Sequence, residues 1–311
     1  EASEVSNELE ITRADMDRFA ERSHRLAAEA TDAGRLADEI VGVTVKSRKG
    51  ESTVEVDEAI RPDTTLETLA KLRAIGGDDA THTAGNAPGV NDGAGAIVVA
   101  SSDWAEREGR TPLARVLSYG MVGDDFAYLA RTPANAAKQA LEKIGKSPEE
   151  VDLWEINEAF ASVALNSVRM LGVDEEKVNV NGGAIALGHP IGASGSRIVG
   201  SLVHELQRRG GGLGVAAICS GGGQGDAIVL AVSASAAPAN RRISASSTCL
   251  VFGAVLNPMS RGAAFFDLDK TLMAGSSGMQ FARVAAQHGI VKRRQLASWG
   301  VEHLRYRLRG T

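Results

Sequence analysis

The sequence is poor in cysteine and in aromatic residues, and it has no excess of positive charge. Its 311 residues include only two cysteines, Cys219 and Cys249, which cannot build a disulfide framework and which favour a reducing cytoplasm. The net charge of −5 provides no basic field for nucleic acid. We find no signal peptide and no apolar run of about 18 residues, the length needed to cross a membrane. We therefore expect a cytoplasmic protein without a nucleic-acid partner or a membrane span.

Small and apolar residues are abundant instead. Apolar residues make up 43% of the chain, aromatic residues only 4%, and there are 35 glycines. Small side chains let helices approach strands closely, and a length of 311 residues suits two domains at about 150 residues each. Apolar strands alternate with amphipathic helices, which predicts a layered α/β fold.

The expected elements follow from apolar periodicity and from capping and turn residues. Thr12 begins a helix that ends at Gly34, and Thr132 is expected to cap a second helix with Pro133 in its first turn and Gly145 after its last. Further helices are expected over 158–171 and 198–206, strands over 39–45, 96–100, 114–119, 151–156, 178–181, 213–218 and 227–232, and loops over 50–63 and 182–192.

The pattern changes near residue 233. Residues 233–247 are rich in Ala, Ser, Pro and Asn, as linkers are, and a new apolar strand is expected over 263–268. We expect domains over 1–107 and 108–235, a poorly ordered linker over 236–258, and a separate segment over 259–311.

Three segments contain residues suited to catalysis: NEAF at 157–160, the glycine-rich stretch around His189, and CSGGG at 219–223. The turn after Cys219 can direct backbone N–H groups at an oxyanion and lower the pKa of the thiol. Pro190 holds His189 extended, so that its imidazole can act on a thiol or an oxyanion. Taken singly, a cysteine before a turn is more often a small buried apolar residue, a loop histidine is usually structural, and Asn157 could simply cap a helix.

The exact sequences of these segments and their order along the chain are together more specific than any single residue. NEAFA at 157–161, NVNGGAIALGHPIGASG at 179–195 and CSGGG at 219–223 resemble the thiolase family, and so do RPDTTL at 61–66, TAGN at 83–86 and NDGA at 91–94. The resemblance covers about residues 1–233. It implies a thiolase-like layered fold of helices and a mixed sheet, in a homodimer or homotetramer.

The resemblance also implies coenzyme A-dependent acyl transfer, with coenzyme A as a substrate and with no tightly bound cofactor. His189 would activate a nucleophilic cysteine and share an oxyanion hole with a water held by Asn157. Cys219 would move the proton of the acetyl α-carbon or of the coenzyme A thiol, and the N–H of Gly221 would join a second oxyanion hole. Ala84, Gly85, Asn86 and Pro88 would line the coenzyme A-binding loop.

The chain departs from the family pattern in several places. It has no nucleophilic cysteine of the N-terminal half, and it begins with Glu1 and not with Met, so we expect an incomplete N-terminal half. Strands that should pair with 96–100 are expected to be missing. Pro88 replaces a serine that helps to bind coenzyme A, and the glycine usual before the helix at Thr132 is absent.

The tail carries a second motif, AAFFDLDKTL at 263–272, an apolar strand that ends in two carboxylates. It resembles the first motif of haloacid-dehalogenase-type (HAD) phosphatases of the phosphoserine-phosphatase-like branch. The resemblance implies a partial HAD Rossmann-like segment with Asp267 as nucleophile, Asp269 as general acid/base, and Mg²⁺ between them. The later motifs of that family are absent, and MSRG at 259–262 precedes the strand as a natural start would, which favours two joined reading frames or a clipped bifunctional protein.

Three functions are compatible with the sequence. The first is a thiolase that is inactive without its nucleophilic cysteine. The second is a phosphatase-type function of the tail beside a noncatalytic thiolase part. The third is a thiolase-like protein that binds acyl-CoA without turnover, which the presence of Asn157, His189 and Cys219 together argues against.

Overall fold

The computed structural model describes residues 2–47, 50–77, 79–89, 91–234 and 251–254. The chain divides into two compact units, residues 1–266 and 267–311, and every described residue belongs to the first. Within this part, every helix is too short or too polar to cross a bilayer.

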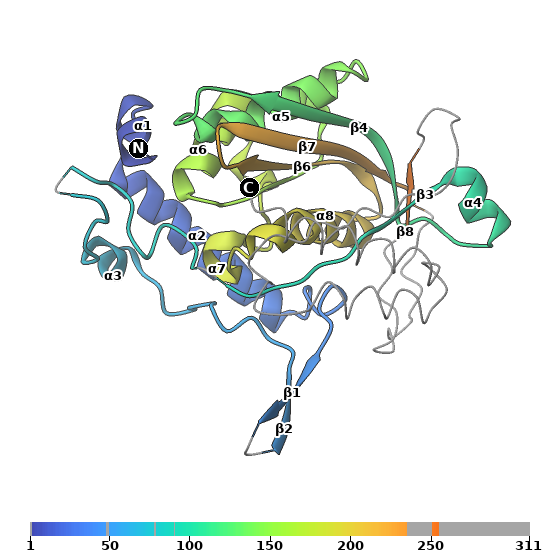
Figure 1. The fold of residues 1–311 in the computed structure, drawn as a ribbon, viewed down its shortest axis with the longest axis horizontal. Coiled ribbons are helices and arrows are strands. Elements are labelled where there is room, and N and C mark those ends of the chain that lie inside the picture. The colour runs from blue at the N-terminus through green and yellow to red at the C-terminus, as the bar shows by residue number, and fades with distance from the viewer. Residues whose placement is uncertain (1, 48–49, 78, 90, 235–250, 255–311) are drawn as a thin grey trace, which may run out of the picture. The chain divides into compact units, whose positions relative to one another are not determined.

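The helices and strands appear in Figure 1 in chain order. The helices are α1 (Ala2–Glu8), α2 (Arg13–Asp32), α3 (Leu66–Ala70), α4 (Ser102–Arg107), α5 (Thr132–Glu142), α6 (Ala161–Leu171), α7 (Ala184–Leu187) and α8 (Ile191–Arg208), with 3-10 turns at Leu129–Arg131, Pro148–Glu150 and Glu175–Lys177. The strands are β1 (Val43–Ser47), β2 (Gly50–Val54), β3 (Val98–Ser101), β4 (Ala114–Gly123), β5 (Leu153–Ile156), β6 (Gly212–Ser220), β7 (Gln224–Val232) and β8 (Val251–Ala254).

A mixed sheet forms the centre of the described unit, with strand order β3-β8-β4-β7-β6-β5. β5 and β6 are parallel, and β7 is antiparallel to both β6 and β4. β8 lies parallel to β3 and β4. α5 and α6 cover one face of the sheet and α8 the other, as Figure 1 shows. This three-layer arrangement confirms the predicted layered α/β fold with a mixed sheet.

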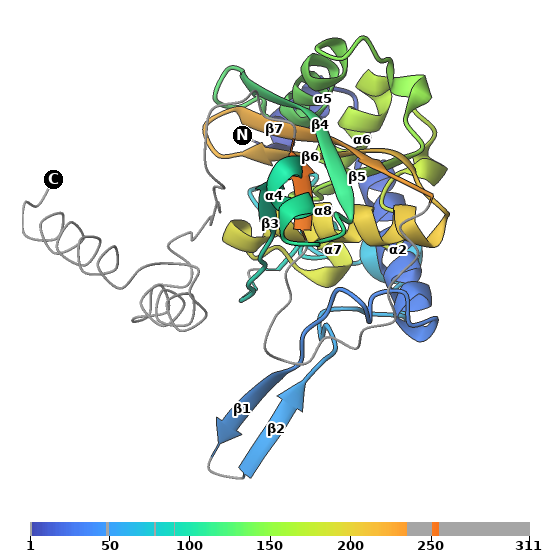
Figure 2. The ribbon, with the colours of Figure 1, turned by 90° about the vertical axis from the view of Figure 1, so that its right-hand side faces the viewer.

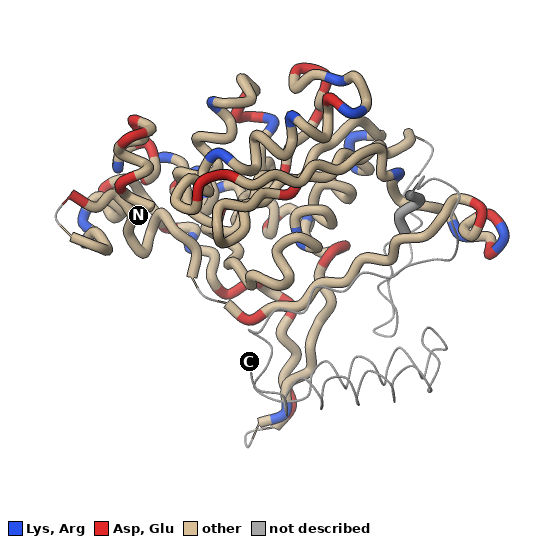
Figure 3. Tube along the Cα trace, turned by 45° about the horizontal axis from the view of Figure 1, so that its top comes forward, with Lys and Arg blue, Asp and Glu red and all other residues tan. Residues whose placement is uncertain are grey.

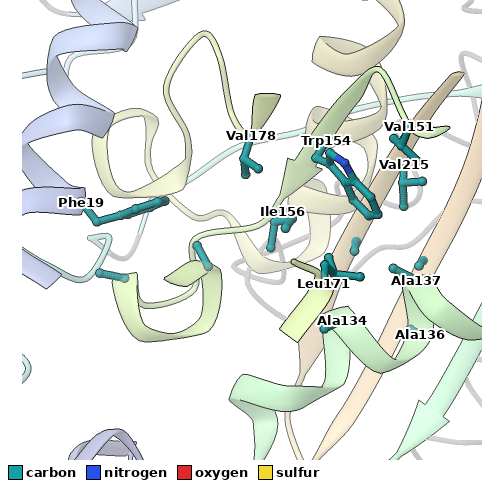
Figure 4. Packing of buried hydrophobic residues seen from close by; sticks show 14 of the residues in the cluster. Phe19, Ala134, Ala136, Ala137, Val151, Trp154, Ile156, Leu171, Val178 and Val215 are labelled. Atoms are coloured by element: carbon teal, nitrogen blue, oxygen red, sulfur yellow. The ribbon is translucent and has the colours of Figure 1, made fainter. Parts of the chain in front are cut away.

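The two faces of the sheet bury different side chains of the same strands. On β5, Trp154 and Ile156 belong to the cluster under α5 and α6, whereas Leu153 packs with α8. Figure 4 shows Trp154 and Ile156 projecting from β5 toward the helix that carries Ala134 and Ala137. α5 lies so close to β4 that a Cβ on Gly120 would meet the carbonyl oxygen of Ala136, so small residues set the spacing of the layers.

Several predicted elements are confirmed with changed limits. Thr12 caps α2 in a capping box with Asp15, as predicted. Thr132 does not act as an N-cap: Arg131 holds that position, and the Thr132 hydroxyl donates to the carbonyl oxygens of Leu129 and Gln224. α6 begins three residues later than predicted, because Phe160 is extended.

The predictions for residues 39–63 were wrong in detail. The strand expected over 39–45 begins only at Val43, and the loop expected over 50–63 contains β2, which pairs with β1 as an antiparallel hairpin. All ten strand residues are exposed, so neither face of the hairpin is buried. In Figure 2 it extends away from the helices and the sheet.

The region around Asn179 also differs from the prediction. No strand forms over 178–181, where only isolated bridges join Val178 to Trp154 and Val180 to Gly182. Asn179 has φ +49°, a left-handed conformation that interrupts an extended strand. The loop expected over 182–192 contains α7 and the start of α8.

β8 corrects two expectations. Val251–Ala254 lie inside the linker expected over 236–258, yet they form a strand of the central sheet, and they provide the partner that we expected residues 96–100 to lack. The physical reason is composition: residues 249–256 read CLVFGAVL, an apolar run suited to a strand and unlike the Ala/Ser-rich residues before it. The other residues of that range, and the segment 259–311, lie outside the described residues.

Charged side chains pair along the periphery. Figure 3 shows acidic and basic residues interspersed along the trace. Near the end of α8, Glu205 accepts hydrogen bonds from Asn181, Arg208 and Arg209. Burial acts to raise the pKa of Glu205, but these hydrogen bonds outweigh it and lower that pKa to about 2.

Candidate active site

Asn157 lies at the carboxyl end of β5, and its side chain is buried. Its backbone N–H donates to the carbonyl oxygen of Ala217 at 2.9 Å, which places it beside β6. α6 begins only at Ala161, so Asn157 is not a helix cap. Its amide is therefore available to a neighbouring polar group.

That neighbour is the imidazole of His189, which lies between α7 and α8. Asn157 Nδ2 is 3.4 Å from His189 Nε2, and Ser194 Oγ is 2.6 Å from His189 Nδ1. Burial and the positive charge of Arg197 lower the pKa of His189 below its ordinary value. The ring is thus held between two polar side chains and favours its neutral form.

The backbone before His189 is fixed by Asn91. Asn91 Oδ1 accepts from the His189 N–H at 3.3 Å. Gly188 has φ +98°, and a Cβ there would lie 2.6 Å from the Asn91 amide carbon, so glycine is required at this position. The NDGA and GHP motifs therefore meet, although almost 100 residues separate them in the sequence.

Cys219 lies near the carboxyl end of β6, just before the glycine turn into β7. It packs in a small apolar cluster with Ala130 and Val163. Burial raises the pKa of its thiol to about 11. Our expectation of a lowered pKa was wrong, because desolvation of the buried thiol outweighs the lowering effect of a backbone hydrogen bond.

The topology brings Asn157 and Cys219 to the same edge of the sheet. β5 and β6 are parallel neighbours, and each residue lies at or just beyond its strand's carboxyl end. Gly221 follows in the exposed turn. Among the described residues no hydrogen bond joins Cys219 to His189, so their predicted separation of roughly 4–6 Å stays a prediction.

Two charged residues of this site were not identified from the sequence. Arg197 of α8 donates from Nη1 to Glu155 Oε2 at 3.1 Å and from Nη2 to Asn157 Oδ1 at 3.4 Å. Burial raises the pKa of Glu155 to about 8, against the lowering effect of Arg197. A glutamate within the apolar strand at 151–156 was the available signal, because a buried acid requires a polar partner.

Among the residues expected to bind coenzyme A, Asn86 is buried, and its side chain makes hydrogen bonds within the protein. Its amide donates to Asp17 and to the carbonyl oxygen of Thr81, and its Oδ1 accepts from the Thr83 N–H. Ala84 is exposed, and Gly85 and Pro88 are half-buried. Asn86 can therefore shape this loop, whereas its neighbours lie at the surface.

Metal binding has no support within the described residues, where His, Cys, Asp and Glu form no group of three or more that could hold an ion. The proposed Mg²⁺ ligands Asp267 and Asp269 lie outside the described residues.

Curated proteins of known activity are similar to this chain. It is 50% identical over 229 residues to an acetyl-CoA acetyltransferase of Paracoccus denitrificans, covering 74% of this chain and 59% of that protein. It is 48% identical over 231 residues to a beta-ketoadipyl-CoA thiolase of Pseudomonas aeruginosa, covering 74% and 58%. The chain thus spans somewhat less than three fifths of the length of these relatives.

Solved structures agree with this. The crystal structure of human mitochondrial 3-ketoacyl-CoA thiolase matches with a TM-score of 0.69 and 43% identity, over 75% of this chain and 59% of the human one. The acetyl-CoA acetyltransferase of Bacillus anthracis matches with a TM-score of 0.71 and 43% identity, over 74% and 59%.

Two family models match consecutive parts of the sequence. The thiolase N-terminal domain matches residues 1–103, and the thiolase C-terminal domain matches residues 110–232. Together these two matches cover well over half of the chain. Through these residues the chain belongs to the thiolase family of acyltransferases.

Proposed function

We propose that residues 1–232 contribute part of a thiolase active site, which catalyses the thiolysis of 3-ketoacyl-CoA or the reverse Claisen condensation of acetyl-CoA. The observation that carries this proposal is the contact between Asn157 and His189 at the sheet edge where Cys219 also lies. Both reactions need a group that handles protons beside groups that stabilise an oxyanion.

We assign the roles of the side chains from the thiolase resemblance, and the chemistry of each group is compatible with its role. His189 accepts the proton of a nucleophilic thiol and then donates to the thioester oxygen, together with a water held by Asn157. Cys219 is neutral at neutral pH, because burial raises its pKa to about 11. A neutral thiol of this kind is a proton donor, and its thiolate is a base strong enough to take an acetyl α-proton. The exposed turn at Gly221 offers a backbone N–H for the resulting enolate oxygen.

Coenzyme A and its thioesters are the proposed substrates, bound along the loop of Ala84, Gly85 and Pro88, with Asn86 holding the loop from inside. The internal hydrogen bonds of Asn86 support this division of roles. We also propose from the family that the protein assembles as a homodimer or homotetramer. Light scattering of the purified protein tests this.

The acyl-accepting thiol has no counterpart in these 311 residues, whose only cysteines are Cys219 and Cys249. We therefore expect that the chain alone forms no acyl-enzyme with labelled acetyl-CoA. Coexpression with an N-terminal thiolase half that carries the nucleophilic cysteine should restore thiolysis, Cys219→Ala should abolish it, and Cys249→Ala should leave it intact.

Two results would change this proposal. Label retained on Cys219 of the chain alone would make that residue the nucleophile. Coenzyme A binding by calorimetry, with no turnover in a folded and associated complemented enzyme, would favour an acyl-CoA-binding protein.

A separate proposal concerns residues 259–311, where the motif around Asp267 and Asp269 supports a partial HAD-type segment that binds Mg²⁺. Because the later motifs of that family are absent, we expect no hydrolysis of p-nitrophenyl phosphate. Mg²⁺-dependent turnover that is lost in Asp267→Asn would show instead that the tail is a phosphatase.

A further inference from the structure

A chain of polar contacts runs from a buried acid to the imidazole of the site. Glu155 holds the guanidinium of Arg197 at 3.1 Å, Arg197 reaches Asn157 Oδ1 at 3.4 Å, and Asn157 Nδ2 faces His189 Nε2 at 3.4 Å. The side chains of Glu155 and Arg197 are 4% and 21% exposed, so this hydrogen-bonded pair lies inside the protein. Alternation along β5 places Glu155 on the face that α8 covers, where Arg197 enters.

The direction of each contact is fixed by what each group can donate. A guanidinium donates only, so the atom of Asn157 that faces Arg197 must be the carbonyl oxygen. The other end of the same amide is then the NH₂ group, which also donates only. His189 Nε2 must therefore accept, which requires that it carries no proton.

The other side of the ring leads independently to the same state. The Ser194 hydroxyl donates to the carbonyl oxygen of Pro190 at 3.0 Å, so its remaining lone pairs face His189 Nδ1 at 2.6 Å. A lone pair at this distance calls for a proton on Nδ1. Both sides of the imidazole thus specify the same neutral tautomer, with the proton on Nδ1.

We propose that Arg197, anchored by Glu155, is a positioning residue that orients the Asn157 amide and thereby holds His189 in the Nδ1–H tautomer, with Nε2 free to take a proton. An imidazole without such constraints prefers the Nε2–H form, which cannot accept a proton at Nε2. Both 3.4 Å contacts are long, so each is weak, and the orientation depends on how firmly Glu155 holds the Arg197 guanidinium.

The positioning role rests on the proposed function, because it matters only if Nε2 accepts a proton from a thiol. The tautomer itself requires no turnover. If complemented protein lacks thiolase activity while His189 is found as Nδ1–H, the proposed function fails and the inference about the tautomer stands.

The test is long-range ¹H–¹⁵N correlation NMR on the full chain labelled at histidine, at a pH well above the ordinary histidine pKa of about 6.5. The ring signals of His189 are assigned by their disappearance in His189→Asn. In the wild type we expect a protonated Nδ1 and an unprotonated Nε2. The Arg197→Met variant should lose the protonated Nδ1 signal in favour of Nε2–H, because the freed amide can turn its oxygen toward Nε2 and the Ser194 hydroxyl can rotate to donate to Nδ1.

Two further variants separate positioning from folding. Arg197→Lys should retain Nδ1–H, because an ammonium can still donate to Asn157. Arg208→Met is the matched control, since Arg208 also lies on α8 and also pairs with a buried glutamate, but has no link to His189; it should leave the tautomer unchanged.

If Arg197→Met does not fold, Asn157→Asp decides, because a carboxylate facing Nε2 accepts only and should draw a proton onto it. A wild type with Nε2–H would overturn the proposal. So would an unchanged tautomer in folded Arg197→Met or in Asn157→Asp, or a changed tautomer in Arg208→Met.

Discussion

The carboxylate of Glu158 accepts three hydrogen bonds in the interior near the site, so replacing it tests directly how much these bonds stabilise the fold. Its Oε2 accepts from Ser23 Oγ at 2.7 Å and from the Ile185 N–H at 3.0 Å. Its Oε1 accepts from Asn179 Nδ2 at 2.8 Å. The side chain is fully buried and joins α2, the turn at Asn179 and the start of α7, which ends two residues before His189.

The loss of stability in Glu158→Gln can be worked out from the groups that donate to the carboxylate. Glutamine keeps the volume but replaces one acceptor by a donor, and all three neighbours donate. If its NH₂ faces Asn179, that amide loses a partner; if it faces Ile185, the backbone N–H does. At least one buried donor is unsatisfied in either orientation, which costs about 1–3 kcal/mol.

Glu158→Ala removes the acceptor of all three hydrogen bonds at once. Three penalties of this size sum to about 3–9 kcal/mol, and water that enters the vacated space recovers part of it. We expect a loss of roughly 4 kcal/mol in the free energy of unfolding, a large share of the stability of an ordinary domain.

The measurement is urea unfolding of the full chain followed by circular dichroism. The matched control is Glu29→Gln on α2, whose half-exposed side chain makes one ion pair with Arg25, and which should change the unfolding free energy by less than about 0.5 kcal/mol. If Glu158→Gln is as stable as this control, the three hydrogen bonds do not contribute as argued.

Three further outcomes are expected. In a Cys249→Ser background, iodoacetamide should alkylate Cys219 far more slowly than a free thiol near pH 8, because the pKa of Cys219 is raised from 9.0 to about 11. The stability that the neutral thiol contributes is complete below pH 9.0 and is lost as the pH rises through about 11. Rapid alkylation of folded protein would contradict this. The carboxylate of Glu205, with its pKa lowered from 4.5 to about 2, contributes stability above pH 4.5 that is lost as the pH falls through about 2. Glu205→Gln should therefore lower the free energy of unfolding by about 1–3 kcal/mol at pH 7 and by much less at pH 2. Equal losses at both pH values would refute the assignment. At Asn179, with φ +49°, the Asn179→Ala and Asn179→Gly variants both lose the side-chain hydrogen bonds, but the alanine variant should be less stable than the glycine variant by about 1 kcal/mol in thermal unfolding. The reverse order would mean that the left-handed backbone is not retained.

The layers of the fold could be predicted because their signal is local and periodic. Ile198, Leu202 and Leu206 repeat at helical spacing, and they form the face of α8 that packs on the sheet. The strands at 213–218 and 227–232 were found because they are apolar throughout. They turned out longer, since the polar residues at the turn continue the pairing up to Ser220 and Gln224.

The errors arose where a residue's conformation depends on distant partners. Asn179 is left-handed because its amide binds the backbone of Ile156 and the carboxylate of Glu158. Likewise, the thiol of Cys219 is desolvated by Ala130 and Val163, which lie far from it in sequence. The family motifs identified Asn157 and His189, but no sequence rule pairs Arg197 with Glu155, since that pairing depends on how α8 crosses β5.

The β1–β2 hairpin consists of backbone pairing without a buried face, and this has a consequence for amide hydrogen exchange. Opening it exposes almost no new apolar surface, because all ten strand residues are already exposed. Its amides should therefore exchange through a local opening whose free energy hardly responds to added denaturant. The amides of β6, paired on both sides between β5 and β7, exchange only when the sheet itself opens, and their protection should fall steeply as denaturant is added.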